Sequence, residues 1–216
     1  MNQVEYNQIN KNLRVHHSKR ERAVAFDNEF YYKFWVPGWE HGLVTRHGIE
    51  SGFYDKSISC VLDSIIVDSG RDIGYRMHRA QVAGGSRDSW QNLIENTTKE
   101  TRQKFITSIM EKSVSLGMTV TDMCPSNVVI YNGEISLIDY EGLASFDWLF
   151  NSKPQPWEAQ NRNLKKYPTP FWRDMSKHIK SYAEQCIGVK YSKDLSSMHN
   201  FLDFCHKIKT AVELSN

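Results

Sequence analysis

The 216-residue sequence has no long hydrophobic run: nowhere do about eighteen apolar residues follow one another, as a membrane-spanning helix would require. Its first residues are polar and lack the apolar stretch of a signal peptide. Cysteine is scarce, and the four cysteines form neither a C-x-x-C pair nor a metal-ligand spacing. This pattern disfavours a disulfide framework and a zinc site. We therefore expect a cytoplasmic protein without a transmembrane segment.

An excess of one charge is also lacking. The chain has 27 Lys and Arg against 25 Asp and Glu, which gives a formal net charge of +2. Binding to nucleic acid draws most of its affinity from clustered cations that meet the phosphates. The aromatic segment Tyr31 to Trp35 could stack on bases, but core packing explains it better. The composition predicts no nucleic-acid partner.

The residue types change along the chain, and this change indicates how the chain is divided. Aromatic and β-branched residues dominate residues 1–80, where turn residues separate them into pairs of short runs. Such pairs are typical of β-hairpins. The predicted strands are Ala23 to Phe26, Phe30 to Val36, Ile58 to Val67 and Ile73 to Met77, and a short helix is expected from Gly42 to Lys56.

Helical periodicity begins after Gly84-Gly85. Apolar residues recur at every third or fourth position from Trp90 to Leu116, and amphipathic segments follow at 171–186 and 198–214. We therefore predict an α+β fold of two lobes. A small β-rich N-lobe would cover residues 1–80, a connector 81–87, and a reduced, mostly helical C-lobe 88–216.

Oxygen-bearing side chains gather around one further predicted hairpin. Asp122 and Asn127 stand in a proline-containing loop before the apolar run Val128 to Tyr131, and an Asn132-Gly133 turn leads to a second apolar strand that delivers Asp139. Such a hairpin would aim three oxygen ligands at one point. Phosphoryl transfer needs this set: a carboxylate that orients the attacking hydroxyl, and an amide and a second carboxylate that hold Mg²⁺ against the phosphates of ATP.

Turn chemistry is the simpler explanation of the loop. Proline fixes φ, and Asn and Asp side chains bond to nearby backbone amides. The loop alone therefore does not decide between a structural turn and a catalytic one. The two flanking apolar runs and the Asn-Gly turn between them favour the catalytic interpretation, because they fix where Asp139 falls.

The spacing D-x-x-x-x-N before an apolar-apolar-Asp strand resembles the catalytic loop and metal-binding motif of the protein-kinase-like superfamily. Further landmarks follow in the order of that family: Lys33 lies within an aromatic strand, Glu50 within the expected helix, and Met77 to Ala80 where the connector should begin. The resemblance extends over roughly residues 10–150, and only the region from Asp122 to Asp139 is specific.

The resemblance implies ATP and Mg²⁺ as cofactors and assigns a role to each matching residue. Asp122 would be the catalytic base, and Asn127 and Asp139 would be the Mg²⁺ ligands. Lys33 would hold the phosphates, with Glu50 as its partner and Glu40 as the competing candidate. The backbone of His78, Arg79 and Ala80 would hold the adenine.

Several positions depart from regulated protein kinases. Val120-Thr121 stands where those enzymes have His-Arg, Asp139-Tyr140-Glu141 replaces Asp-Phe-Gly, and Pro156-Trp157-Glu158 is only a faint echo of Ala-Pro-Glu. No G-x-G-x-x-G precedes Lys33; the charged segment Val15 to Arg22 occupies that place. The pattern looks more like the small bacterial sugar kinases, such as the lipopolysaccharide-core (Kdo/heptose) kinases and the aminoglycoside phosphotransferases.

The function that the resemblance implies is a kinase-like phosphotransferase that uses ATP and Mg²⁺ to phosphorylate a hydroxyl of a small-molecule or sugar acceptor. A protein acceptor and the transfer of AMP stay open as alternatives. A catalytically dead kinase-like binding module is a further alternative. The missing Gly-rich loop favours it, whereas the joint presence of Lys33, Asp122, Asn127 and Asp139 argues against it. The C-terminal helices, where acceptors are usually selected, carry no motif that names one.

Overall fold

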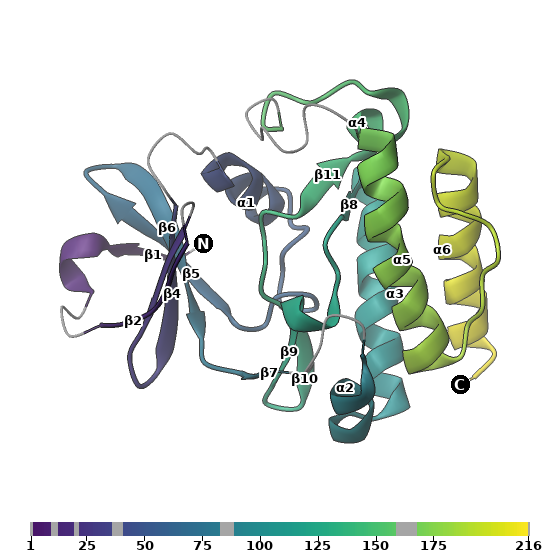
Figure 1. Cartoon of the computed structure of the whole chain (residues 1–216), viewed down its shortest axis with the longest axis horizontal. Helices are drawn as coiled ribbons and strands as arrows, with labels where there is room; N and C mark the ends of the chain where they lie inside the picture. Colours follow the sequence, from purple (N-terminus) through teal and green to yellow (C-terminus); the bar gives the residue numbers. More distant parts are fainter. Residues whose placement is uncertain are drawn as a thin grey trace.

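The computed structural model describes residues 2–9, 13–19, 22–35, 41–82, 89–158 and 168–215. They form a β-rich N-lobe and a largely helical C-lobe, which lie side by side (Figure 1). The predicted α+β architecture of two lobes is confirmed. Of the predicted connector, only residues 81 and 82 are among those described.

Among the described residues, the N-lobe is built on a six-stranded sheet with the order β1-β5-β6-β4-β3-β2. β1 runs parallel to β5, and the other neighbours are antiparallel. The strands are β1 (Asn2–Glu5), β2 (Arg14–Lys19), β3 (Arg22–Phe26), β4 (Phe30–Trp35), β5 (Leu62–Asp68) and β6 (Arg71–His78), and a single 3-10 turn, Tyr6–Gln8, follows β1.

Both predicted hairpins of the N-lobe are present. At the β3–β4 turn, Asp27 Oδ1 accepts hydrogen bonds from the N–H groups of Glu29 and Phe30 at 2.9 and 2.8 Å, the side-chain turn chemistry expected of Asp. β5 begins at Leu62 rather than at the predicted Ile58. The reason is local, because the N–H of Ile58 instead closes a turn by donating to Asp55 O at 3.1 Å.

Helix α1 (His41–Glu50) is shorter than the predicted helix. The chain leaves the helix at Gly52, which has a φ of 78° that favours glycine and commonly ends helices. Phe53 and Tyr54, expected on the helix, are buried in the turns that follow it. Tyr54 then packs back against Gly48, where an added Cβ would come within 2.5 Å of the tyrosine ring.

The C-lobe contains α2 (Gln91–Asn96), α3 (Lys99–Leu116), α5 (Pro168–Ile187) and α6 (Met198–Glu213). α3 packs against both α5 and α6 (Figure 1). The predicted helical stretch from Trp90 to Leu116 is divided in two, because Thr98 caps a new helix by accepting from the N–H of Thr101. No described helix has the length and apolar character needed to cross a membrane.

Short elements connect the lobes to the loop that carries the candidate site. β7 (Gln81–Val82), β9 (Val128–Tyr131) and β10 (Glu134–Leu137) form one small sheet, and β8 (Met118–Val120) pairs with β11 (Leu143–Ser145). The predicted Asn132-Gly133 turn joins β9 to β10, and both turn residues have positive φ. A 3-10 turn η2 (Pro125–Asn127) precedes β9, and helix α4 (Phe146–Asn151) follows β11.

One apolar core runs through both lobes and includes Ile65 and Tyr75 of the N-lobe together with Ile106 and Phe204 of the C-lobe. Side chains along β4 alternate between the two faces of the sheet. Tyr32 joins a smaller cluster on the outer face. Lys33, its neighbour, therefore points to the opposite face, toward the C-lobe.

Candidate active site

The loop between β8 and β9 holds the first two predicted site residues together. Asn127 Nδ2 donates to Asp122 O at 3.0 Å, which leaves the amide oxygen of Asn127 for other partners. Pro125 starts the η2 turn, and the N–H of Asn127 closes it by donating to Cys124 O at 2.9 Å. The turn chemistry considered in the sequence is therefore real, and it fixes Asp122 and Asn127 on one loop.

The β9–β10 hairpin brings the third residue, Asp139, close to Asn127. Val128 pairs with Leu137, and the N–H of Ile138 donates to Asn127 O at 3.1 Å. Asp139 therefore leaves the hairpin beside the loop that carries Asn127. The sequence spacing predicts that Asn127 and Asp139 lie close together, and the register of the hairpin is consistent with this prediction.

Lys33 reaches this point from the N-lobe. Its Nζ donates to Asp139 Oδ1 and to Glu141 Oε2, each at 2.8 Å. The lysine is only 7% exposed, and its ammonium lies 5.5 Å from the centroid of the Tyr75 ring. A strand lysine on the solvent face, the structural alternative, is excluded by this burial. The predicted phosphate-binding lysine and a predicted metal ligand are thus in direct contact.

The segment Asp139-Tyr140-Glu141 is anchored on its core side. Tyr140 is fully buried, and its ring packs against those of Tyr54 and Tyr75 with centroids 5.0 and 5.1 Å away. The backbone is held as well: Tyr54 OH donates to Tyr140 O at 3.0 Å, and Tyr75 OH to Ile138 O at 3.1 Å. With Tyr140 in the core, the carboxylates on either side of it are both presented to Lys33.

Glu50 does not pair with Lys33, and the predicted partnership is corrected here. Its side chain is 57% exposed and forms an i,i+4 ion pair with Arg46 at 3.0 Å. Arg46 also binds Asp72 of β6, with Nη2 and Oδ1 2.6 Å apart. Glu50 therefore points outward from helix α1, and the ion pair of Arg46 with Asp72 attaches the helix to the sheet. The competing candidate, Glu40, lies outside the described residues.

Two of the backbone groups predicted to bind adenine, near the end of β6, already form hydrogen bonds within the protein. The N–H of His78 donates to Val61 O at 2.7 Å, and that of Arg79 donates to Glu29 O at 3.0 Å. Both donors are used inside the protein, so the N–H groups of His78 and Arg79 are not available to a base. The contact stays a prediction for the remaining backbone groups of His78 to Ala80.

The residues that the sequence assigns to Mg²⁺ suit that ion chemically. Asn127 and Asp139 offer an amide and a carboxylate oxygen, the hard ligands that Mg²⁺ prefers. In the described part of the chain, no group of three or more His, Cys, Asp or Glu side chains could hold a metal ion. Mg²⁺ that is bound together with phosphates usually takes only one or two carboxylates from the protein, so these two residues would be enough.

Sequence reasoning missed a second buried carboxylate network, which lies in the segment after α4. Glu158, 1% exposed, accepts from the N–H and the hydroxyl of Ser145, both at 2.6 Å, and from the N–H of Gln155 at 2.8 Å. The adjacent Trp157 stacks on His47 of α1 with ring centroids 4.3 Å apart, and burial lowers the pKa of His47. The contacts of Glu158 and Trp157 attach the segment after α4 to both lobes. The only signal in the sequence was the weak similarity of Pro156-Trp157-Glu158 to the Ala-Pro-Glu motif.

One predicted feature falls where little is described. Residues 15–19 of the charged segment that stands in the place of a Gly-rich loop belong to β2, and Arg22 begins β3, which pairs with β2 in antiparallel register. The side chains between Val15 and Ala23 lie outside the described set.

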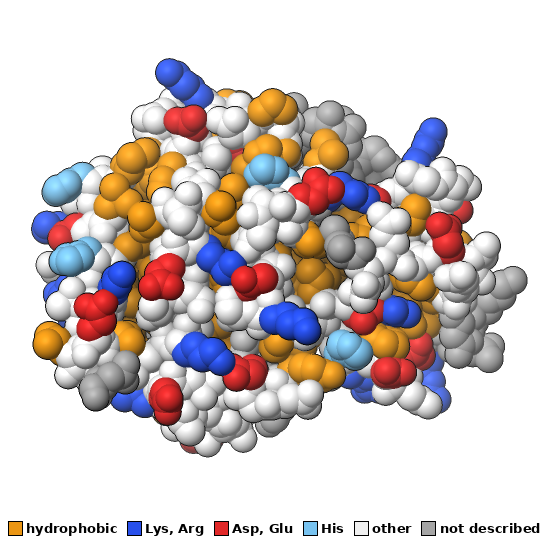
Figure 2. All heavy atoms as spheres, turned by 180° about the vertical axis from the view of Figure 1, so that it is seen from behind, with side chains coloured by type: hydrophobic (Ala, Val, Ile, Leu, Met, Phe, Trp, Pro, Cys, Tyr) orange, Lys and Arg blue, Asp and Glu red, His pale blue; other side chains and the backbone are white. Residues whose placement is uncertain are grey.

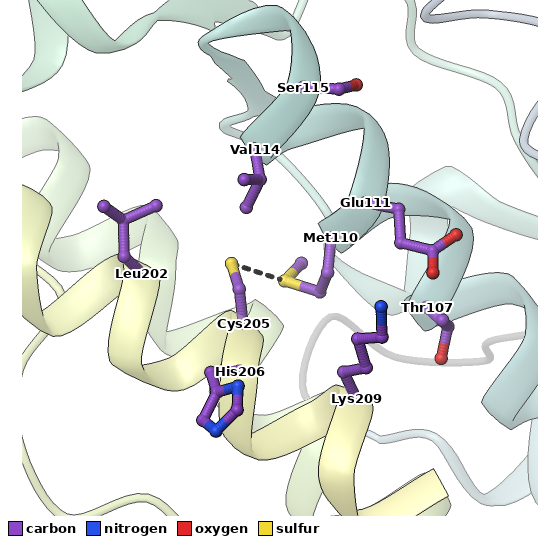
Figure 3. A pocket seen from close by; sticks show the side chains of 9 residues that line it. All are labelled: Thr107, Met110, Glu111, Val114, Ser115, Leu202, Cys205, His206 and Lys209. Atoms are coloured by element: carbon purple, nitrogen blue, oxygen red, sulfur yellow. Dashed lines mark hydrogen bonds between the residues drawn. The ribbon is translucent and has the colours of Figure 1, made fainter. Parts of the chain in front are cut away.

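The surface offers a separate pocket between α3 and α6 (Figure 3). Its volume is about 390 Å³, and none of the predicted site residues lines it. Met110 and Cys205 meet there with their sulfur atoms 3.4 Å apart.

On the face shown in Figure 2, the coloured Lys and Arg side chains are interspersed with Asp and Glu, so this face carries no extended basic patch.

The order of the described elements is that of the predicted protein-kinase-like fold: a lysine-bearing strand, a helix, two further strands and a helical lobe with the motif hairpin. No protein-family model and no curated protein matches the chain. The fold is similar to a solved structure of WbdD, with 13% identity and a TM-score of 0.42 over 80% of this chain and 47% of that one.

Two other solved structures are also similar. A complex of WbdD with the kinase inhibitor LY294002 has 12% identity and a TM-score of 0.39, over 76% of this chain and 46% of that one. The streptomycin-ATP-APH(2")-IIa ternary complex has 9% identity and a TM-score of 0.42, over 82% of this chain and 90% of that one. The chain thus spans about half the length of the WbdD chains. Similarity at this level says nothing about activity or acceptor.

Proposed function

We propose that this protein is a phosphotransferase that uses ATP and Mg²⁺ to phosphorylate a hydroxyl of a small-molecule or sugar acceptor. The observation that carries the proposal is the contact between Lys33 and Asp139, 2.8 Å apart in space and 106 positions apart in sequence. A buried cation from one lobe and a carboxylate from the other meet beside the loop of Asp122 and Asn127. This is the set of charges that phosphoryl transfer requires.

Each residue has a distinct task in this proposal. Lys33 balances the negative charge of the phosphates, and Asn127 and Asp139 hold the metal ion. Asp122 orients the acceptor hydroxyl and takes up its proton. When bound, the Mg²⁺ complex of ATP supplies the phosphoryl group and neutralises charge that builds up on it. The hydrogen bond from Asn127 to Asp122 O keeps the base and the metal-binding amide in a fixed relation.

We expect Asp122→Ala to lower phosphate transfer by about 10²- to 10⁴-fold, the usual contribution of a general base. The affinity for ATP should change by no more than about twofold, because Asp122 faces the acceptor in this proposal rather than the nucleotide. The measurement is incubation with labelled ATP and a panel of sugars, aminoglycosides and proteins, with calorimetry for ATP binding. Asp174→Ala, which removes an exposed carboxylate paired with Lys177, is the matched control.

The same experiment separates the alternatives. Mass analysis of the modified acceptor distinguishes a phosphate from an AMP group, and the panel distinguishes a protein acceptor from a small one. Wild-type protein that binds ATP but modifies none of the acceptors would favour the binding module. Full transfer by Asp122→Ala would remove Asp122 from the mechanism.

We also expect the unphosphorylated protein to be active. Thr121 stands where regulated protein kinases have an arginine that pairs with an activation-loop phosphate, and its hydroxyl instead donates to Gly142 O at 2.9 Å. Ser145 is 6% exposed and engaged with Glu158, so a kinase could not reach it without local unfolding. Recombinant protein that is unphosphorylated by mass spectrometry should turn over ATP. Activity that appears only after phosphorylation of Ser145 or Ser152 would contradict this expectation.

A further inference from the structure

Among the described residues, two carboxylates contact the Lys33 ammonium, and they differ in their surroundings. The side chain of Asp139 is 21% exposed, whereas that of Glu141 is 3% exposed. Both contacts are 2.8 Å long. Asp139 thus stands at the edge that solvent and ligands can reach, and Glu141 lies behind it.

The two carboxylates also differ in what else they contact. Glu141 Oε1 accepts from the indole N–H of Trp35 at 3.3 Å, while Glu141 Oε2 binds Lys33. Trp35 and Lys33 are two positions apart on β4 and so face the same side of the strand. Glu141 therefore accepts hydrogen bonds from two side chains of strand β4, and these bonds fix its position relative to the N-lobe sheet.

Charge balance gives the two carboxylates different roles once the nucleotide binds. In the proposed function, the carboxylate of Asp139 would bind Mg²⁺. Its ion pair with Lys33 would then be weaker. A buried ammonium needs a remaining counter-charge and hydrogen-bond acceptor, because burying a charge without a partner is costly. Glu141 meets this need. Glu50, whose family counterpart pairs with the lysine, is 57% exposed and engaged with Arg46.

We propose that Glu141 is the positioning residue that aims Lys33 at the nucleotide phosphates, in the role that the sequence resemblance had given to a glutamate of helix α1. Trp35 fixes Glu141, and the packing of Tyr140 presents Glu141 on the same side as Asp139. The inference rests on the proposed function, because it concerns the lysine of that same site. It assigns no metal to Glu141.

The test is binding of ATP measured by calorimetry, both with Mg²⁺ and in EDTA without it. Glu141→Gln should weaken binding under both conditions by about ten- to a hundredfold, the range known for residues that orient a metal-binding side chain. Lys33→Met should do the same. The double variant should be no weaker than Lys33→Met alone, because residues that act through one another are not additive.

Further variants separate positioning from structural loss. Trp35→Phe removes the indole N–H and keeps a ring, so it should weaken ATP binding in the same direction but less. Glu141→Asp, which restores the charge, should recover part of the affinity lost in Glu141→Gln. Glu134→Gln, at an exposed carboxylate paired with Lys104, is the matched control, and thermal unfolding of each variant checks that the fold persists.

Three results would overturn the inference. Normal ATP affinity of Glu141→Gln in EDTA, with a defect only in Mg²⁺ dependence, would make Glu141 a metal ligand. A defect in Glu50→Gln equal to that of Lys33→Met would return the role to helix α1. Unchanged binding in Glu141→Gln under both conditions would leave Glu141 a structural ion pair. None of these three results bears on the proposed function, which the transfer assay tests separately, whereas a wild type that binds no ATP would overturn both.

Discussion

Replacement of Asp139 by alanine is expected to lower Mg²⁺-dependent turnover of ATP by about a thousandfold or more. A metal ion at a phosphoryl-transfer site contributes several kcal/mol of charge stabilisation in the transition state, and each 1.36 kcal/mol is a factor of ten in rate. Asp139 is the only carboxylate of the two proposed metal ligands, so its loss leaves the amide of Asn127 alone. Asn127→Ala should show a milder form of the same defect.

The Asp139→Ala protein should still fold, which makes the result interpretable. Lys33 keeps the buried Glu141 as its partner, so the ammonium is not left without a counter-charge. The measurements are turnover and ATP affinity over a range of Mg²⁺ concentrations, with the thermal midpoint recorded beside them. Asp147→Ala serves as the control. Asp147 lies in helix α4, and its carboxylate accepts hydrogen bonds from the side-chain amides of Asn151 and Gln155. Unaltered affinity for the Mg²⁺ complex of ATP and unaltered turnover would show the metal assignment to be wrong.

The hairpin of the site was predictable because its information is local. An Asn-Gly turn between two apolar runs sets the register, and the register sets Asn127 beside Ile138 and hence beside Asp139. Lys33 was predictable in part, because alternation along β4 shows that it and Tyr32 face opposite sides. Whether Lys33 or Tyr32 faces the C-lobe depends on how the whole sheet packs. A local sequence pattern does not carry this information.

The partner of Lys33 could not be predicted because the choice depends on contacts far apart in the sequence. Glu50 is turned outward by the ion pairs of Arg46, and one of these involves Asp72 on β6. Glu141 was visible only as a departure from Asp-Phe-Gly. Its pairing with Lys33 spans 108 positions and needs both lobes in place.

Tyr140 connects the apolar core to the candidate site. It is fully buried between Tyr54 and Tyr75, and it stands between the two carboxylates that contact Lys33. Removal of the ring would leave a cavity where three aromatic rings now meet. It would also free the segment that carries Asp139 and Glu141, so stability and nucleotide binding are coupled through this side chain.

We therefore expect Tyr140→Ala to lower the free energy of unfolding by about 3–5 kcal/mol, the usual cost of truncating a large buried aromatic side chain. For a chain of this size the thermal midpoint should fall by on the order of 10 °C. ATP affinity measured below that midpoint should fall as well, because both carboxylates lose their fixed orientation. Tyr140→Phe keeps the ring and should retain stability within about 1 kcal/mol and normal ATP affinity. A Tyr140→Ala protein with unchanged thermal midpoint and ATP affinity would mean that Asp139 and Glu141 are held by other contacts, and that the aromatic cluster does not organise the site.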